Sequence, residues 1–145
     1  MRANDANAYI YKYAVAWCLG LNREKHKMFK HILRNLEKIA EAEEFMNLNV
    51  NQICEILIGA YQDWIVTGID NYYNLFMMGL KWIDHDQAGR LCYAIPIMSC
   101  VPFKKMTKKE ILLCYYPPVA KYVVMLPGVK SMIQSAIYTN VEAST

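Results

Sequence analysis

Apolar side chains recur every three or four residues along most of the chain, which is the spacing of one face of an α-helix. A first stripe predicts a helix over residues 5–19, which Gly20 ends. A second stripe predicts a helix over residues 24–42, with basic side chains along another face. The stripes consist of Ile10, Tyr13, Trp17 and Leu21, and of Phe29, Ile32, Leu33, Leu36, Ile39 and Ala40.

The middle of the chain contains two further predicted helix starts. After a turn at residues 44–48, Asn49 can cap a helix that continues to Leu57. Residues 67–70 have the spacing of a capping box, with Asp in place of the usual Glu. The next helix is apolar nearly all round, so it belongs in the middle of a bundle. Its apolar residues are Tyr72, Leu75, Phe76, Met78, Leu80, Trp82 and Ile83.

Prolines divide the last third of the chain. Pro96 should kink or end its helix, because it lacks an amide donor and clashes with the preceding turn. Thr107 and Glu110 have capping-box spacing, and the two prolines at 117 and 118 stop the helix that follows. Pro127 suits the first position of a last helix. Together the patterns predict an all-α fold of about seven or eight short helices in stacked antiparallel pairs.

Composition narrows the class of protein. A length of 145 residues with 55% apolar content suits one domain with a sizeable core. The net charge of +3 is too small to argue for nucleic acid, and no apolar run approaches the ~18 residues that span a membrane. The five cysteines are odd in number and form no Cys-x-x-Cys pair, which predicts reduced, mostly buried thiols in the cytoplasm or nucleus.

Candidate chemistry is sparse. His85 lies between two aspartates but has no further ligands at suitable spacing, and His26 and His31 are five residues apart rather than four. A Gly-rich phosphate loop and a His-Glu-x-x-His motif are both missing from the sequence. We therefore expect no enzyme activity, no cofactor and no metal.

The best-marked motif of the chain is an apolar helix followed by Trp-x-x-x-Asp-x-x-x-Arg. This motif, with others in order along the chain, resembles the BACK domain of BTB-BACK-Kelch proteins. A Glu-Phe-x-x-Leu step precedes this motif, and Val-x-Phe-x-x-Met follows, with Pro102 where the family has Arg. Asn7 resembles the Asn that opens the family's first helix, with Ala8 and Tyr9 in place of Cys-Leu. The motif residues are Phe45, Leu48, Phe76, Trp82, Asp86, Arg90 and Phe103.

The resemblance implies a BACK-like helical domain over residues 7–140. Residues 1–6 are then a tail or a truncated helix, and 141–145 a tail or linker. It implies a spacer and interaction domain in a substrate adaptor for a cullin-RING ubiquitin ligase. Such a domain orients a substrate-binding module and contributes to cullin contact, beside a BTB module through which the whole protein dimerises. The alternative is a helical scaffold in transcription or cytoskeletal organisation with no ubiquitin role. Nucleic acid and membrane are not expected partners.

Two groups of residues have open interpretations. Trp82, Asp86 and Arg90 could form a binding site, but a structural role is favoured: Trp82 would fill the core, and Asp86 would cap a helix and pair with Arg90. The lysines at 104, 105, 108 and 109 are either a solvated face or a surface for an acidic partner. With Tyr9 on the first helix, they form the candidate partner surface: Tyr9, Lys104, Lys105, Lys108 and Lys109.

Overall fold

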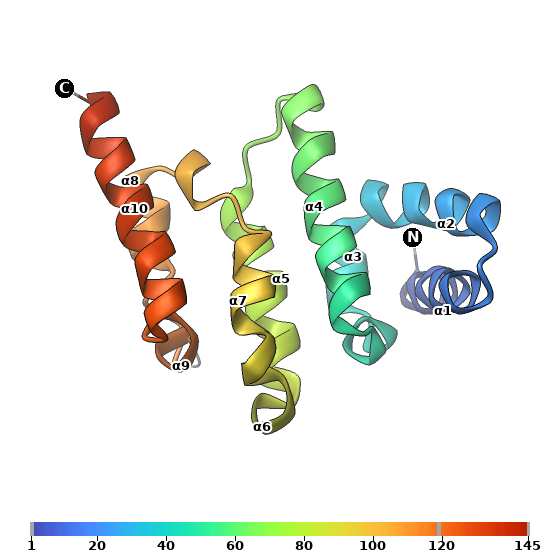
Figure 1. The fold of residues 1–145 in the computed structure, drawn as a ribbon. Coiled ribbons are helices and arrows are strands. Elements are labelled where there is room, and N and C mark those ends of the chain that lie inside the picture. The colour runs from blue at the N-terminus through green and yellow to red at the C-terminus, as the bar shows by residue number, and fades with distance from the viewer. Residues whose placement is uncertain (1, 119, 145) are drawn as a thin grey trace. The chain divides into compact units, whose positions relative to one another are not determined.

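The structure is a computed structural model that describes residues 2–118 and 120–144, and its helices are shown in Figure 1. It is 82% helical, and the described residues form no strand. The predicted all-α fold is therefore confirmed. The α-helices are α1 (Ala3–Leu19), α2 (Asn22–Arg34), α3 (Leu36–Glu41), α4 (Val50–Thr67), α5 (Tyr72–His85), α6 (Gln87–Arg90), α7 (Ala94–Ser99), α8 (Lys108–Leu113), α9 (Ala120–Val124) and α10 (Pro127–Ser144). Three short 3-10 helices join them: η1 (Glu43–Asn47), η2 (Leu91–Tyr93) and η3 (Phe103–Lys105).

The chain divides into two compact units, Met1–Ala60 and Tyr61–Thr145. In the first unit, α1 packs against α2, α3 and η1. In the second unit, α10 packs against α7, η3, α8 and α9, while α5 packs against α6 and α7. Each unit has its own fully buried apolar residues: Ile10, Ile32, Ile39 and Phe45 in the first, and Leu75, Phe76, Ile83, Ile97 and Ile133 in the second.

Local signals fixed several helix ends correctly. Gly20 ends α1 in the left-handed conformation, with φ of 70°. Asn49 caps α4 in a reciprocal pair with Gln52, each side chain accepting a hydrogen bond from the other residue's backbone N–H, at 2.9 and 3.0 Å. The predicted capping box of α8 is present too, between Thr107 and Glu110. Each of these signals depends on one residue or on two residues three apart, which is why the sequence alone reveals them.

The single helix predicted over residues 24–42 was wrong, because Asn35 divides it into α2 and α3. Asn35 has extended φ of −131°, outside the helical range. Its side-chain amide donates a hydrogen bond to the carbonyl of His31 at 2.9 Å, and so satisfies a group that the break would have left unpaired. The apolar stripe continues across the break, with Ile32, Leu36 and Ile39 all buried. Periodicity alone therefore could not reveal it.

The capping box predicted at residues 67–70 was wrong. Thr67 is the last residue of α4, and its hydroxyl donates back to the carbonyl of Asp63 at 3.1 Å. Gly68 follows with φ of 79°, which only glycine adopts without strain, so these residues end one helix instead of starting the next. α5 begins at Tyr72, after an Asn71 that makes no side-chain cap.

Pro96 neither kinks nor ends its helix. It is the third residue of α7, in the first turn, where a backbone amide has no partner within the helix to lose. The break lies upstream instead, in the 3-10 turn η2. Proline thus starts this helix, as Pro127 starts α10 in agreement with the prediction.

The ends of the chain are more helical than the sequence indicated. α1 begins at Ala3 within the predicted tail 1–6, and α10 continues to Ser144 within the predicted tail 141–145. The domain limits 7–140 stay a prediction. Across the described residues, no helix combines the length and the apolar character that a membrane span requires.

The prediction of mostly buried thiols was wrong. Only Cys114 is buried; Cys18 and Cys92 are exposed, Cys54 and Cys100 are half-buried, and none of the five is in a disulfide. Cys92 and Cys100 donate their S–H groups to the carbonyls of Gly89 and Pro96, three and four residues earlier. A thiol whose S–H group is hydrogen-bonded to a carbonyl of its own helical turn can lie at the surface of the protein.

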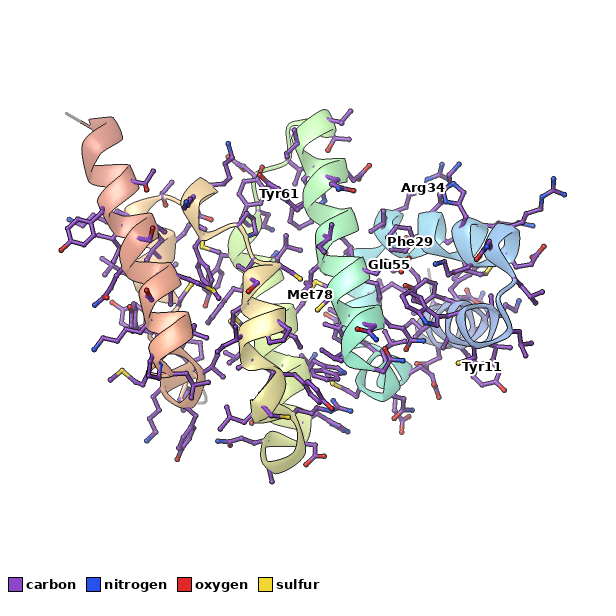
Figure 2. The ribbon with its side chains drawn as sticks, in the orientation of Figure 1. Tyr11, Phe29, Arg34, Glu55, Tyr61 and Met78 are labelled. Carbon is purple, nitrogen blue, oxygen red and sulfur yellow. The ribbon has the colours of Figure 1, made fainter. Side chains whose placement is uncertain are left out.

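A glycine lets α2 approach α4 closely in the first unit. Figure 2 shows Phe29 projecting from α2 toward α4, near Glu55. A Cβ atom on Gly59 of α4 would lie only 2.4 Å from Cζ of the Phe29 ring. The ring also stacks on Tyr13 of α1, with centroids 5.9 Å apart. Phe29 therefore joins three helices of this unit.

Candidate functional site

Trp82 and Arg90 form the best-defined contact among the motif residues. Trp82 lies near the end of α5 and is 2% exposed. The guanidinium of Arg90, at the end of α6, lies 4.1 Å from the centre of the indole, and Nη1 of Arg90 donates a hydrogen bond to the Trp82 carbonyl at 2.8 Å. Burial lowers the pKa of Arg90, and the charge of Asp86 partly offsets this. One side chain thereby covers the indole and satisfies a carbonyl in the last turn of α5.

Asp86 makes the corner between α5 and α6. Its Oδ1 accepts a hydrogen bond from the N–H of Gly89 at 3.3 Å, as predicted for a helix cap. A Cβ on Gly89 would lie 2.6 Å from the other carboxylate oxygen, so glycine leaves the space that the cap occupies. Asp86 also acts electrostatically on Arg90. These contacts favour the structural interpretation of the Trp-Asp-Arg motif over a ligand site.

Phe76 and Phe103 bring two distant motifs together in the second unit. Phe76 is fully buried on α5, and Phe103 is 4% exposed in η3. Their rings meet edge to face with centroids 6.0 Å apart, a favourable arrangement of aromatic quadrupoles. The motif around Phe103 therefore anchors η3, and with it the start of α8, to the core of the unit.

In the first unit, the opening motif and the Glu-Phe step contact each other directly. The side-chain oxygen of Asn7 on α1 accepts a hydrogen bond from the backbone N–H of Glu44 in η1, at 3.0 Å. The adjacent Phe45 is fully buried and Leu48 is 2% exposed. Asn7 thus positions the turn that inserts both apolar side chains, and sequence reasoning had not linked these two motifs.

Tyr9, a predicted partner-surface residue, is only half-buried and already has a neighbour. Its ring stacks on His31 of α2, with centroids 4.7 Å apart and an interplanar angle of 14°. The four predicted lysines, Lys104, Lys105, Lys108 and Lys109, are all exposed, on η3 and the first turn of α8. Tyr9 lies in the first unit and the lysines in the second. The predicted partner surface therefore divides into two separate candidates.

An exposed apolar stripe on α1 went unnoticed in the sequence. Tyr11, Val15 and Leu19 are 60%, 37% and 67% exposed, and their spacing of four places them along one face of the helix. Figure 2 shows Tyr11 on the side of α1 that faces away from α2. The i, i+4 spacing was visible, but the stronger stripe of buried residues on the same helix masked it.

A polar cluster holds α1, α2 and α4 together beside that stripe. The Lys25 ammonium lies 4.4 Å from the centre of the Trp17 ring and 3.7 Å from the Glu55 carboxylate. The hydroxyl of Tyr13 is buried nearby and makes no hydrogen bond of good geometry among the described residues. Burial raises the pKa of Tyr13, and the negative charge of Glu55 raises it further.

We predict that Tyr13→Phe raises the free energy of unfolding by roughly 1 kcal/mol. An unsatisfied buried hydroxyl costs about 1–3 kcal/mol, and the substitution removes it while keeping the ring that packs on Phe29. Urea denaturation would measure the change. Tyr11→Phe, at an exposed tyrosine of the same helix, should change nothing. A loss of more than about 1 kcal/mol in Tyr13→Phe would instead indicate a working hydrogen bond with Glu55.

Within the described segments, no three His, Cys, Asp or Glu side chains gather in a way that could hold a metal ion.

Comparison with protein families decides the identity of the fold. The model of the family BACK, described as BTB And C-terminal Kelch, matches residues 9–115. The chain belongs to the BACK family. The matched region of this BACK domain begins within α1, two residues after Asn7, and extends just beyond α8, so it includes the motif residues from Phe45 to Phe103. Searches of curated proteins and of solved structures each gave no match.

Family membership accounts for the arrangement of the motifs. A BACK domain is a non-enzymatic, protein-interaction type of helical domain found in BTB-Kelch proteins. The motif residues of this BACK domain contact one another within each unit, whereas its exposed apolar and basic residues lie elsewhere. Interaction surfaces are therefore to be sought on α1 and on η3–α8, and not at the Trp-Asp-Arg motif.

Proposed function

We propose that the chain is the helical spacer and interaction domain of a substrate adaptor for a cullin-RING ubiquitin ligase. In this role it orients the substrate-binding module and contributes part of the contact with the cullin scaffold. Membership of the BACK family supports the adaptor role. The exposed stripe on α1 supports the partner contact, because exposed apolar side chains arranged along one helix face are typical of protein interfaces.

The first unit is suited to present such a stripe. α1 is packed against α2, α3 and η1, and the hydrogen bond from Glu44 to Asn7 and the Lys25 cluster fix it further. A rigid helix loses little conformational freedom on binding, so more of its contact energy remains as affinity. One helix face is small, however, against the ~1,200–2,000 Å² that a stable interface buries in total. A BTB module would have to supply the rest.

We therefore expect the isolated chain to bind a cullin amino-terminal domain weakly, and the chain joined to a BTB module to bind it well. Joining two weak surfaces makes the second contact nearly intramolecular, which can raise the affinity ~10²–10⁴-fold. Titration calorimetry of both proteins against the cullin domain would measure this difference. Tight binding by the isolated chain would contradict the proposed division between the modules, and no binding by the joined protein would favour a scaffold with no ubiquitin role.

A paired substitution tests whether the α1 stripe makes the contact. Tyr11→Ala with Leu19→Ala, in the joined protein, should weaken cullin binding by tenfold or more, since ~1.4 kcal/mol of lost contact is a factor of ten. Met125→Ala with Tyr138→Ala is the matched control, because these side chains are similarly exposed but lie in the second unit. An equal loss in both pairs would remove α1 as the contact surface.

A further inference from the structure

Positive charge is concentrated in one part of the sequence. Residues 87–141 contain seven basic residues and a single acidic one, Glu110, for a formal charge of +6. The whole chain carries only +3, so the rest of it is net negative. This uneven distribution is hidden in the overall composition, and the basic stretch 87–141 lies within the second unit.

Four of these basic residues lie on two adjoining short elements. Lys104 and Lys105 are in η3, and Lys108 and Lys109 open α8. All four are exposed, and none has an ion pair with a carboxylate in the described part of the chain. Glu110 does not neutralise them fully, because it is one negative charge beside four positive ones; its carboxylate accepts the N–H of Thr107 in the capping box at 3.0 Å.

Fold stability does not explain the positions of Lys108 and Lys109. Basic side chains in the first turn of a helix lie at the positive end of its dipole, where they are unfavourable by a few tenths of a kcal/mol each. The same two elements are nevertheless held firmly: η3 and α8 pack against α10, Phe103 is buried, and a complete capping box fixes the start of α8. The lysines therefore project from a fixed base.

Exposed apolar side chains continue the same surface. Leu112 lies four residues after Lys108, on the same face of α8, and is 49% exposed. Helical turns continue past α8, with the N–H groups of Tyr115 and Tyr116 donating to the carbonyls of Leu112 and Leu113 at 3.2 and 3.1 Å. Tyr116 is 75% exposed. We define the lysine–tyrosine surface as Lys104, Lys105, Lys108, Lys109, Leu112, Tyr115 and Tyr116.

We propose that the lysine–tyrosine surface docks an acidic peptide segment of another protein. The carboxylates of such a segment would pair with the four lysines, and a leucine or aromatic residue between them would pack on Leu112 and Tyr116. Charge complementarity selects this occupant, since the surface offers four unpaired ammonium groups beside apolar side chains. Nucleic acid fits less well, because the surface has no arginine for bidentate phosphate contacts and the whole chain is only weakly basic.

The proposal is tested with the full chain and a short fluorescein-labelled peptide of alternating Glu and Leu or Tyr, by fluorescence anisotropy. We expect micromolar binding that weakens as salt rises, because exposed charges are screened. The variant Lys104→Gln, Lys105→Gln, Lys108→Gln, Lys109→Gln should bind the peptide about tenfold more weakly. Each exposed ion pair contributes a fraction of a kcal/mol to the free energy of binding, and the variant removes four of them. Glutamine keeps a polar side chain, slightly shorter than that of lysine, and removes the charge.

Matched controls distinguish an effect of the lysine–tyrosine surface on binding from an effect of the total charge of the chain. The variant Lys27→Gln, Lys30→Gln, Arg34→Gln, Lys38→Gln removes the same charge from exposed positions on α2 and α3, and should bind the peptide as the original chain does. Tyr116→Ala should weaken binding about fivefold, the loss typical of an aromatic contact, while Tyr138→Ala, which is 72% exposed on α10, should not.

Four results would each overturn the proposal: equal losses in the two lysine variants, equal binding of a neutral peptide, tighter binding of a single-stranded oligonucleotide than of the peptide, or peptide binding absent. Sedimentation of the chain alone supplies the last test. Self-association that the four-lysine variant abolishes would make a second copy of the chain the occupant. None of these measurements involves the cullin, so they stand apart from the proposed adaptor function.

Discussion

Trp82→Ala is expected to lower the free energy of unfolding by about 3–5 kcal/mol, the range for deleting a large buried aromatic side chain. Trp82 is 2% exposed, and Arg90 covers its ring from 4.1 Å. Removing the indole leaves a cavity and takes away the surface on which the guanidinium rests. A domain of this size has only about 5–15 kcal/mol of total stability, so the variant should be close to unfolding. Chemical denaturation followed by circular dichroism would measure the loss.

Two further variants test whether the loss of stability in Trp82→Ala comes from the buried indole. Trp82→Phe keeps an aromatic ring under Arg90, so it should recover more than half of the loss. Tyr93→Ala removes a 40% exposed ring whose centroid is 6.3 Å from that of Trp82, and should cost far less. A loss below about 1 kcal/mol in Trp82→Ala would mean that the indole is no core anchor, and a binding role for the motif would then have to be reconsidered.

Stability should also fall steeply in alkaline solution, because of Cys114. This thiol is fully buried, and its S–H donates to the carbonyl of Glu110 at 3.4 Å. Burial, together with the negative charge of Glu110, raises the pKa of Cys114 from 9.0 to about 12. Between these values the unfolded chain releases the proton while the folded chain keeps it. The free energy of unfolding should therefore fall by roughly 1.4 kcal/mol per pH unit in this window, and not below it.

Comparison with Cys114→Ala isolates the contribution of this thiol. The variant should be somewhat less stable at neutral pH, yet its stability should decline less steeply above pH 9.0, where the unfolded thiol begins to ionise. Cys18→Ala removes an exposed thiol and should leave the pH dependence of the original chain unchanged. Identical slopes for the original chain and Cys114→Ala would show that the Cys114 thiol ionises as readily in the folded as in the unfolded state.

Interactions within one helical turn were predictable from the sequence, and those that join two turns were not. The capping box of α8 and the proline that opens α10 could be predicted because each depends on a few adjacent residues. Arg90 was expected to pair with Asp86, whereas its guanidinium lies on Trp82, eight residues away. That contact requires the corner between α5 and α6, whose geometry no residue spacing specifies.

The two wrong helix boundaries are exceptions, because both arise from side chains that hydrogen-bond within one helical turn. Asn35 and Thr67 each have a side chain that can hydrogen-bond to more than one nearby backbone group. Asn35 uses the carbonyl of His31 and breaks a helix; Thr67 uses the carbonyl of Asp63 and ends one. Local pattern shows that such residues can act on the backbone, but packing of the whole unit decides which of the alternatives forms. The candidate partner surfaces were harder still to predict from the sequence, because the exposure of a side chain depends on the folded unit.

The close approach of Phe29 to Gly59 limits how this protein could be stabilised by engineering. Replacing a glycine inside a helix with alanine usually gains up to ~1 kcal/mol, since alanine restricts the unfolded chain and favours helix. At Gly59 the new methyl group would clash with the Phe29 ring, which is also stacked on Tyr13. Natural variation at this position should be restricted for the same reason. A consensus or helix-optimising redesign should leave residue 59 as glycine and seek its gains on the solvent-facing positions of α4.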